Sequence, residues 1–95
     1  MIIGIDVGAT ITKAVSVENG KLTRKVKTRA SDAVTAAAGA FGKIVLENKI
    51  PLNEIKAIRI TGVGSAKIKS DIFGIPTNRV DEIRAIGTGG ITCPA

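Results

Sequence analysis

The chain has 95 residues, of which 44% are hydrophobic, and a formal net charge of +6. This length suffices for one small domain with its own core. One cysteine and no histidine exclude an internal disulfide framework and a Cys/His zinc site. No segment approaches the ~18 apolar residues of a membrane span, and the N-terminus lacks the pattern of a signal peptide. We therefore expect a cytoplasmic protein with no membrane partner.

The N-terminal segment predicts two strands joined by a tight turn. The apolar run Ile2–Val7 carries a carboxylate at Asp6 and ends at Gly8, and a second strand follows at Ile11–Val17. An ionised carboxylate resists burial unless something pairs with it. A Gly-Ala-Thr turn beside it exposes backbone N–H groups to an anion. The pattern indicates either a site for a metal-bound phosphate or a tight hairpin with a solvated Asp6.

A third strand is predicted over Lys21–Arg29, after an Asn19-Gly20 turn that favours an antiparallel hairpin. Basic residues crowd this strand: Lys21, Arg24, Lys25, Lys27 and Arg29. They are typical of an edge strand protected against pairing with other chains, or of a patch for nucleic acid. Without Trp or Tyr there is no stacking platform for bases, so nucleic acid is not the expected partner.

The next segment predicts a helix. Ser31 is the expected N-cap, with Asp32 in the first turn, where it complements the helix dipole. Apolar residues then recur at helical spacing from Val34 to Val45. Gly39 and Gly42 lower helix propensity, and we expect them to let the helix approach a sheet closely.

Shorter elements complete the chain. We expect a strand over Ile55–Thr61, a helical piece over Ser65–Ile72, a strand near Asn78–Val80 and a helix over Asp81–Ile86. The order βββαβα(βα) predicts an α/β fold with a mixed sheet and helices on both faces.

Two further segments carry candidate chemistry. Gly62-Val63-Gly64 fails the Walker spacing, and it indicates either a simple strand-ending turn or the wall of a ligand cleft. Glu82 follows a predicted strand, where its carboxylate could face the same cleft as Asp6. Asp81 precedes it and would point about 100° away on a helix, so the two carboxylates are not expected to act as a close pair.

Taken together, these motifs resemble a known superfamily. The quoted segments are Asp6 to Lys13, Thr61-Gly62-Val63-Gly64, Ile75-Pro76 and Val80-Asp81-Glu82. They resemble the N-terminal lobe of the acetate kinase, sugar kinase, Hsp70 and actin (ASKHA) superfamily, and most closely type II pantothenate kinases. The chain departs from that family's Asp-x-Gly-Gly-Thr-x-x-Lys motif at Ala9. The resemblance implies a ribonuclease H-like fold, with ATP and Mg²⁺ as cofactors.

The resemblance also implies roles for single residues. Asp6 would help to place Mg²⁺, Lys13 would neutralise charge at the transferring phosphoryl group, and Glu82 would be the catalytic base toward pantothenate. The cradle for the ATP phosphates would be formed by Gly8, Ala9 and Thr10. These are the parts that phosphoryl transfer requires, here in the first step of coenzyme A biosynthesis.

Such kinases hold ATP between two lobes, and residues 1–95 correspond to the first lobe alone. We therefore expect the isolated chain to be inactive, and we expect a homodimer because half a cleft exposes apolar surface. One alternative is an ATPase activator of 2-hydroxyacyl-CoA dehydratases or benzoyl-CoA reductases; Cys93 alone cannot hold the iron–sulfur cluster of these activators. A second alternative is a non-catalytic binding module that uses the basic strand.

Overall fold

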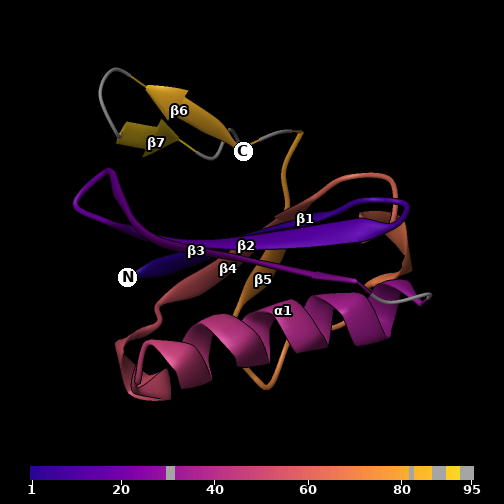
Figure 1. Cartoon of the computed structure of the whole chain (residues 1–95), viewed down its shortest axis with the longest axis horizontal. Helices are drawn as coiled ribbons and strands as arrows, with labels where there is room; N and C mark the ends of the chain where they lie inside the picture. Colours follow the sequence, from indigo (N-terminus) through magenta and orange to yellow (C-terminus); the bar gives the residue numbers. More distant parts are fainter. Residues whose placement is uncertain (30–31, 82, 87–89, 93–95) are drawn as a thin grey trace.

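The computed structural model describes residues 1–29, 32–81, 83–86 and 90–92. Figure 1 shows a sheet with one α-helix packed along it. The elements are β1 (Ile2–Val7), β2 (Ile11–Glu18), β3 (Lys21–Arg29), α1 (Ala33–Glu47), the 3₁₀ turn η1 (Leu52–Glu54), β4 (Ala57–Thr61), the 3₁₀ turn η2 (Ser65–Lys67), β5 (Thr77–Arg79), β6 (Arg84–Ile86) and β7 (Gly90–Thr92).

The sheet is mixed, as the sequence predicts. Its strand order is β5-β4-β1-β2-β3-β7-β6. β1 pairs antiparallel with β2 and parallel with β4, and β4 pairs parallel with β5. The carboxyl ends of β1 and β4 therefore lie at one edge of the sheet, where Asp6 and Thr61 are register partners. This edge is where α/β proteins collect ligands.

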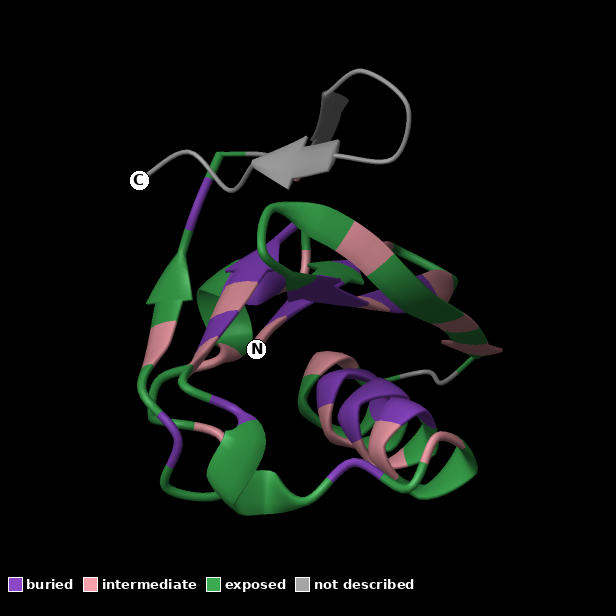
Figure 2. Cartoon of the chain, turned by 90° about the vertical axis from the view of Figure 1, so that its left-hand side faces the viewer, coloured by how far each residue is buried: buried purple, intermediate pink, exposed green. Residues whose placement is uncertain are grey.

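One face of the sheet packs against α1. Ile3, Ile5 and Val7 alternate along β1 and are fully buried, as strand geometry requires of residues that share a face. Their partners include Ile58 and Ile60 of β4 together with Phe41 of the helix. Figure 2 shows this buried layer between the helix and the strands. Within the described part of the chain, no helix is long and apolar enough to cross a membrane.

The other face of strands β1 to β4 points away from α1, and we call it the far face. By strand alternation it carries Gly4, Asp6, Lys13, Val15, Lys25, Lys27 and Arg59. Ile83 covers part of it, because a Cβ at Gly4 would lie 2.7 Å from Ile83 Cδ1. A glycine at this position is what allows the segment after β5 to lie close to the sheet.

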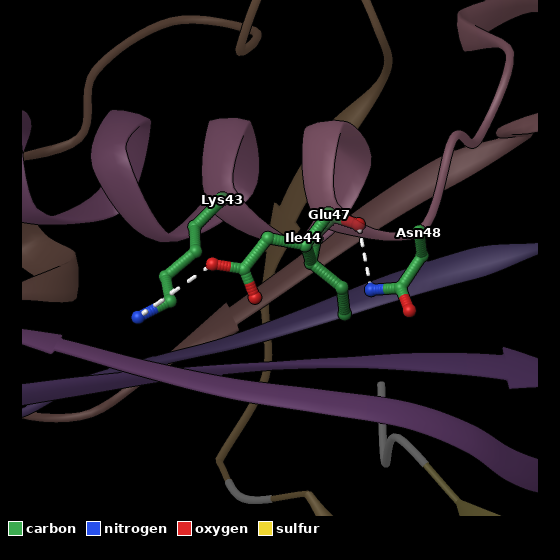
Figure 3. A network of polar contacts seen from close by, with 4 residues as sticks. All are labelled: Lys43, Ile44, Glu47 and Asn48. Carbon is green, nitrogen blue, oxygen red and sulfur yellow. Dashed lines mark hydrogen bonds and ion pairs between the residues drawn. The ribbon is translucent and has the colours of Figure 1, made fainter.

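The two ends of α1 are capped by side chains. Asp32, rather than the predicted Ser31, is the N-cap, since its carboxylate accepts a hydrogen bond from Thr35 N at 2.7 Å; Ser31 lies outside the described residues. That hydrogen bond, with a smaller contribution from Lys67, lowers the pKa of Asp32 below its usual value. At the other end, Asn48 Nδ2 donates to Ile44 O at 2.9 Å (Figure 3).

The prediction for the helical glycines is wrong. A Cβ placed on Gly39 or Gly42 would meet nothing within 4 Å. Close approach to the sheet instead comes from alanines on the buried side of the helix, such as Ala37 and Ala40. Gly39 is exposed on the outer side of α1.

Two predicted helical segments are also wrong. Ser65–Ile72 forms only one 3₁₀ turn, η2, before Ile68 and Ile72 pack against the core. The segment Asp81–Ile86 contains strand β6, which pairs with β7, in place of the expected helix. Among the described residues α1 is therefore the single α-helix, and it covers one face of the sheet rather than both.

Candidate functional site

The turn after β1 is a tight hairpin. Gly8 N donates to Ile11 O at 3.1 Å, so this amide is used by the hairpin itself. A Cβ at Gly8 would lie 2.5 Å from Ile11 O, which explains the glycine. Ala9 and Thr10 are exposed at the tip. Ala9 does not have a positive φ, so its methyl group causes no backbone strain.

Asp6 lies against the turn that follows β4. Gly62 has a φ of +94°, and a Cβ there would be 2.6 Å from Asp6 Oδ1 and 2.5 Å from Val7 O. Only glycine satisfies both the conformation and the space. Asp6 itself is exposed, and it forms no ion pair with any lysine or arginine whose side chain the structure describes. Its carboxylate is therefore available at the edge of the sheet.

A second glycine fastens the same turn to β1. Gly64 N donates to Val7 O at 2.9 Å, and a Cβ at Gly64 would lie 2.5 Å from Val7 Cγ1 and 3.1 Å from Ala33 Cβ. The turn is closed by Ser65 Oγ, which donates to Gly62 O at 2.7 Å. Val63 points into solvent, with 78% of its surface exposed. The segment is thus the strand-ending turn that the sequence allows, and it borders Asp6.

The remaining candidates lie at the same edge or outside the described residues. Lys13 is the cross-strand partner of Asp6 and is exposed. Thr61, on the other side of Asp6, donates from Oγ1 to Asp81 O at 2.8 Å. This hydrogen bond fixes the end of the β5 segment beside β4. Glu82 lies outside the described residues, so its assignment as the base remains a prediction.

Asp6 is the metal ligand that the sequence predicts at this edge, and Glu82 lies outside the described residues. No group of three or more potential ligands among Asp, Glu, Cys and His occurs in the described residues. Mg²⁺ commonly binds through one or two carboxylates plus substrate phosphates and several waters. Asp6 therefore fits a magnesium ion that arrives with a nucleotide, whereas the described residues form no group of three ligands that would hold a resident ion.

Sequence reasoning selected Asp6, Gly8, Ala9, Thr10 and Lys13, and the structure brings these residues to one hairpin. It gave Gly62 only as part of a turn that either ends a strand or lines a cleft, and it did not predict the contact of Gly62 with the Asp6 carboxylate. The available signal was a Thr-Gly pair at the end of a predicted strand. Only the parallel pairing of β4 with β1 makes that pair a neighbour of Asp6.

Comparisons with known proteins agree with this geometry at the level of fold. No family model matches the chain, and no curated protein matches it in sequence. Among the similar solved structures are two dehydratase-related proteins. The activator of 2-hydroxyisocaproyl-CoA dehydratase from Clostridium difficile with bound ADPNP has a TM-score of 0.68 and 18% identity, over 84% of this chain and 28% of that one. Component A of (R)-2-hydroxyglutaryl-CoA dehydratase from Acidaminococcus fermentans has a TM-score of 0.68 and 20% identity, over 84% and 30%.

This likeness shows the fold. It is a mixed α/β fold, as the sequence predicts. The likeness gives no specific support to pantothenate kinase. The chain spans less than a third of the length of either structure.

Proposed function

We propose that the chain is the N-terminal nucleotide-phosphate-binding lobe of an ATPase of the dehydratase-activator type. The observation that carries the proposal is the position of Asp6, which is exposed, unpaired among the described side chains and fixed against Gly62 at the ligand edge of the sheet. Its backbone neighbours form the hairpin tip at Ala9 and Thr10. A carboxylate beside a small-residue turn suits a nucleotide that carries its own Mg²⁺.

Each residue then has a defined task. Asp6 binds or orients the Mg²⁺ that accompanies the phosphates, and Lys13 supplies positive charge beside it. The exposed amides of Ala9 and Thr10 donate hydrogen bonds to phosphate oxygens, in the manner of other backbone anion sites. When bound, Mg²⁺ neutralises charge on the β- and γ-phosphates. A second lobe would complete the cleft, so the chain alone binds nucleotide weakly and does not hydrolyse it.

The activator assignment is preferred to the kinase because one similar structure is a dehydratase activator that contains ADPNP and another is component A of a related dehydratase. No comparison supports pantothenate as the acceptor. The kinase assignment depends on Glu82, which the structure does not describe. We therefore keep pantothenate kinase as the second candidate, on the resemblance of the Val80-Asp81-Glu82 segment, whose Asp81 O accepts a hydrogen bond from Thr61 Oγ1 beside Asp6.

Nucleotide binding tests the proposal directly. Titration of Mg·ADPNP into the 95-residue chain, followed by amide NMR, should shift the signals of Asp6, Gly8 to Thr10 and Gly62 to Gly64. We expect a dissociation constant of about 1 mM, equivalent to about 4 kcal/mol, because half of the cleft is missing. Asp6→Asn should weaken binding about tenfold, the effect of about 1.4 kcal/mol.

The matched control is Asp71→Asn. It removes the same charge from an exposed residue, and the asparagine oxygen can still accept the hydrogen bond from Thr77 N. Thr77 begins β5 and pairs with Ile58 near the start of β4, whereas Asp6 lies beside the carboxyl end of β4. Equal weakening by Asp6→Asn and Asp71→Asn would contradict the site. The two candidates separate in a longer parent protein: bound iron and a brown colour indicate an activator, and pantothenate-dependent ATP consumption indicates a kinase.

A further inference from the structure

Lysine side chains gather on the far face of β2 and β3. Lys13 and Lys27 are direct cross-strand partners, and Lys25 lies two residues from Lys27, opposite Val15. All three lysines are exposed. Direct partners in a sheet have Cβ atoms about 5 Å apart, and alternate residues of one strand are about 7 Å apart. The structure thus places three ammonium groups around one small area.

This arrangement is unfavourable by itself. Like charges directly opposite in a sheet destabilise it, and salt only partly screens groups this close. Among the side chains that the structure describes, the one ion pair joins Lys43 and Glu47 on α1. Asp6 is the register partner of Lys13 on this face but forms no ion pair with it, and no carboxylate of the described residues pairs with Lys25 or Lys27. Among the described residues β3 pairs with β7 at Lys21 alone, so the rest of its outer side is open and edge protection explains Lys25 and Lys27. It does not explain Lys13, which lies on the inner strand β2.

The lysines surround a hollow. Its volume is about 360 Å³, and it is lined by Lys13, Val15, Lys25, Val26 and Lys27. The volume is at the lower end of the range for small-molecule pockets, so it suits a small ligand better than a duplex. No aromatic residue lines the hollow. A ligand there would be recognised by its charge rather than by stacking of a base.

We propose that Lys13, Lys25 and Lys27 form a binding site for a small ligand that carries adjacent phosphate groups. Each phosphate would accept charge-assisted hydrogen bonds from more than one lysine, and its negative charge would offset the repulsion between Lys13 and Lys27. The same face carries a further positive charge at Arg59, in the row that leads through Gly4 and Val15 to Lys25.

This site goes beyond the proposed function, because it requires neither Asp6, nor Mg²⁺, nor the turn after β1. Lys13 belongs to both sites, so the test uses Lys25 and Lys27. Inorganic tripolyphosphate is the probe, titrated in EDTA into the 95-residue chain by calorimetry and amide NMR. We expect Lys25→Gln or Lys27→Gln to weaken binding about tenfold, as for loss of one charge-assisted hydrogen bond. Lys27→Arg should retain most of the affinity.

Lys56→Gln is the matched control. Lys56 is exposed, and it precedes the amino-terminal end of β4, whereas Asp6 lies beside the carboxyl end of that strand. Equal weakening by Lys56→Gln and Lys27→Gln would show a general charge effect and overturn the site. Tighter binding of a single-stranded oligonucleotide, at equal phosphate concentration, would also overturn it in favour of nucleic acid.

Asp6→Asn separates this inference from the proposed function. The substitution should weaken Mg·ADPNP binding and leave metal-free tripolyphosphate binding unchanged or slightly tighter, since a nearby negative charge is removed. Loss of tripolyphosphate binding in Asp6→Asn would refute a separate lysine site. A normal lysine site with no Mg·ADPNP binding would refute only the proposed function. Circular dichroism would confirm that each variant is folded.

Discussion

The two faces of the sheet differ in how strongly packing constrains the residues they carry. On the face toward α1, Ile3, Ile5 and Val7 are fully buried and pack with Phe41 of the helix. On the far face, Asp6 and Lys13 occupy the alternate positions of the same strands and are exposed. One strand therefore supplies both the core and the candidate chemistry.

This difference follows from the period of a β-strand. Because successive side chains point to opposite faces, packing on one face places few demands on the other. Polar and charged residues can vary on the far face with little cost to folding, provided that no backbone contact is disturbed. Gly62 is the exception. It follows the packed strand β4 and also touches Asp6, so a substitution there affects both the packing and the candidate site.

The largest expected effect is on the packed face. Phe41→Ala should lower the free energy of unfolding by about 3–5 kcal/mol, because it removes a fully buried ring and leaves a cavity. Phe73 is the control, because its ring lies 5.7 Å from that of Phe41 but is 67% exposed. Phe73→Ala should cost about 1 kcal/mol, the value of an aromatic pair. Urea denaturation measures both, and similar losses would contradict the packed core.

Phe41→Ala removes much of the stability of a small domain, which is about 5–15 kcal/mol in total. Phe41→Leu provides a milder test with a cost of about 1 kcal/mol. It should give a folded chain whose midpoint lies between those of the wild type and Phe41→Ala. A midpoint equal to that of Phe41→Ala would mean that the ring position, not the buried volume, determines stability.

Gly62→Ala should have the next largest effect. The methyl group would meet Val7 O and Asp6 Oδ1 at 2.5 and 2.6 Å, in a conformation with φ of +94°. We expect a loss of about 1–3 kcal/mol together with weaker Mg·ADPNP binding. Gly39→Ala is the control; it should stabilise the chain by up to about 1 kcal/mol, because Gly39 lies in an open part of the helix. If Gly62→Ala and Gly39→Ala changed the free energy of unfolding in the same direction, the explanation from space and backbone conformation would be wrong.

Much of the fold could be predicted from residue periodicity. The apolar run Ile2–Val7 and the Asn19-Gly20 turn correctly predict β1 and the β2–β3 hairpin, in which Asn19 and Gly20 have φ values of 53° and 77°. The segment Ser65–Ile72 could not be read in this way, because its composition favours a helix. Long-range packing of Ile68 and Ile72 against the core prevails over that local preference.

The candidate site was predictable only in part, for a related reason. Asp6 and Gly8 to Thr10 are close in sequence, so their motif alone places them together. The contact of Gly62 with Asp6 depends on the parallel pairing of β1 and β4, which no local pattern specifies. The strand at Arg84–Ile86 differs, because its partner β7 is close in sequence, with Ile86 opposite Gly90, and the prediction failed there because the spacing of the segment also fits a helix.

On the far face we expect a substitution that stabilises the chain, by a smaller amount than the losses above. Lys27→Gln should stabilise the chain by a few tenths of a kcal/mol at low ionic strength, because it removes repulsion across the pair with Lys13. The gain should disappear near 1 M salt, where the screening length is about 3 Å. Thermal melts at both salt concentrations measure it. If Lys27→Gln instead lowered the stability at low salt, Lys27 would take part in packing. The far face would then contribute to packing more than the exposure of its residues suggests.

The smallest effect concerns the cap of α1, where the packed face meets the ligand edge. The pKa of Asp32 is lowered mainly by its hydrogen bond from Thr35 N, so the folded state favours the charged carboxylate. Its contribution is therefore complete above its unfolded pKa of about 3.9 and is lost as the pH falls through the lower, folded pKa. Asp32→Asn keeps a good N-cap but cannot titrate. Its melting temperature should match that of the wild type near neutral pH and fall less steeply below about pH 4. Parallel curves through that range would show that Asp32 does not cap the helix as an ion.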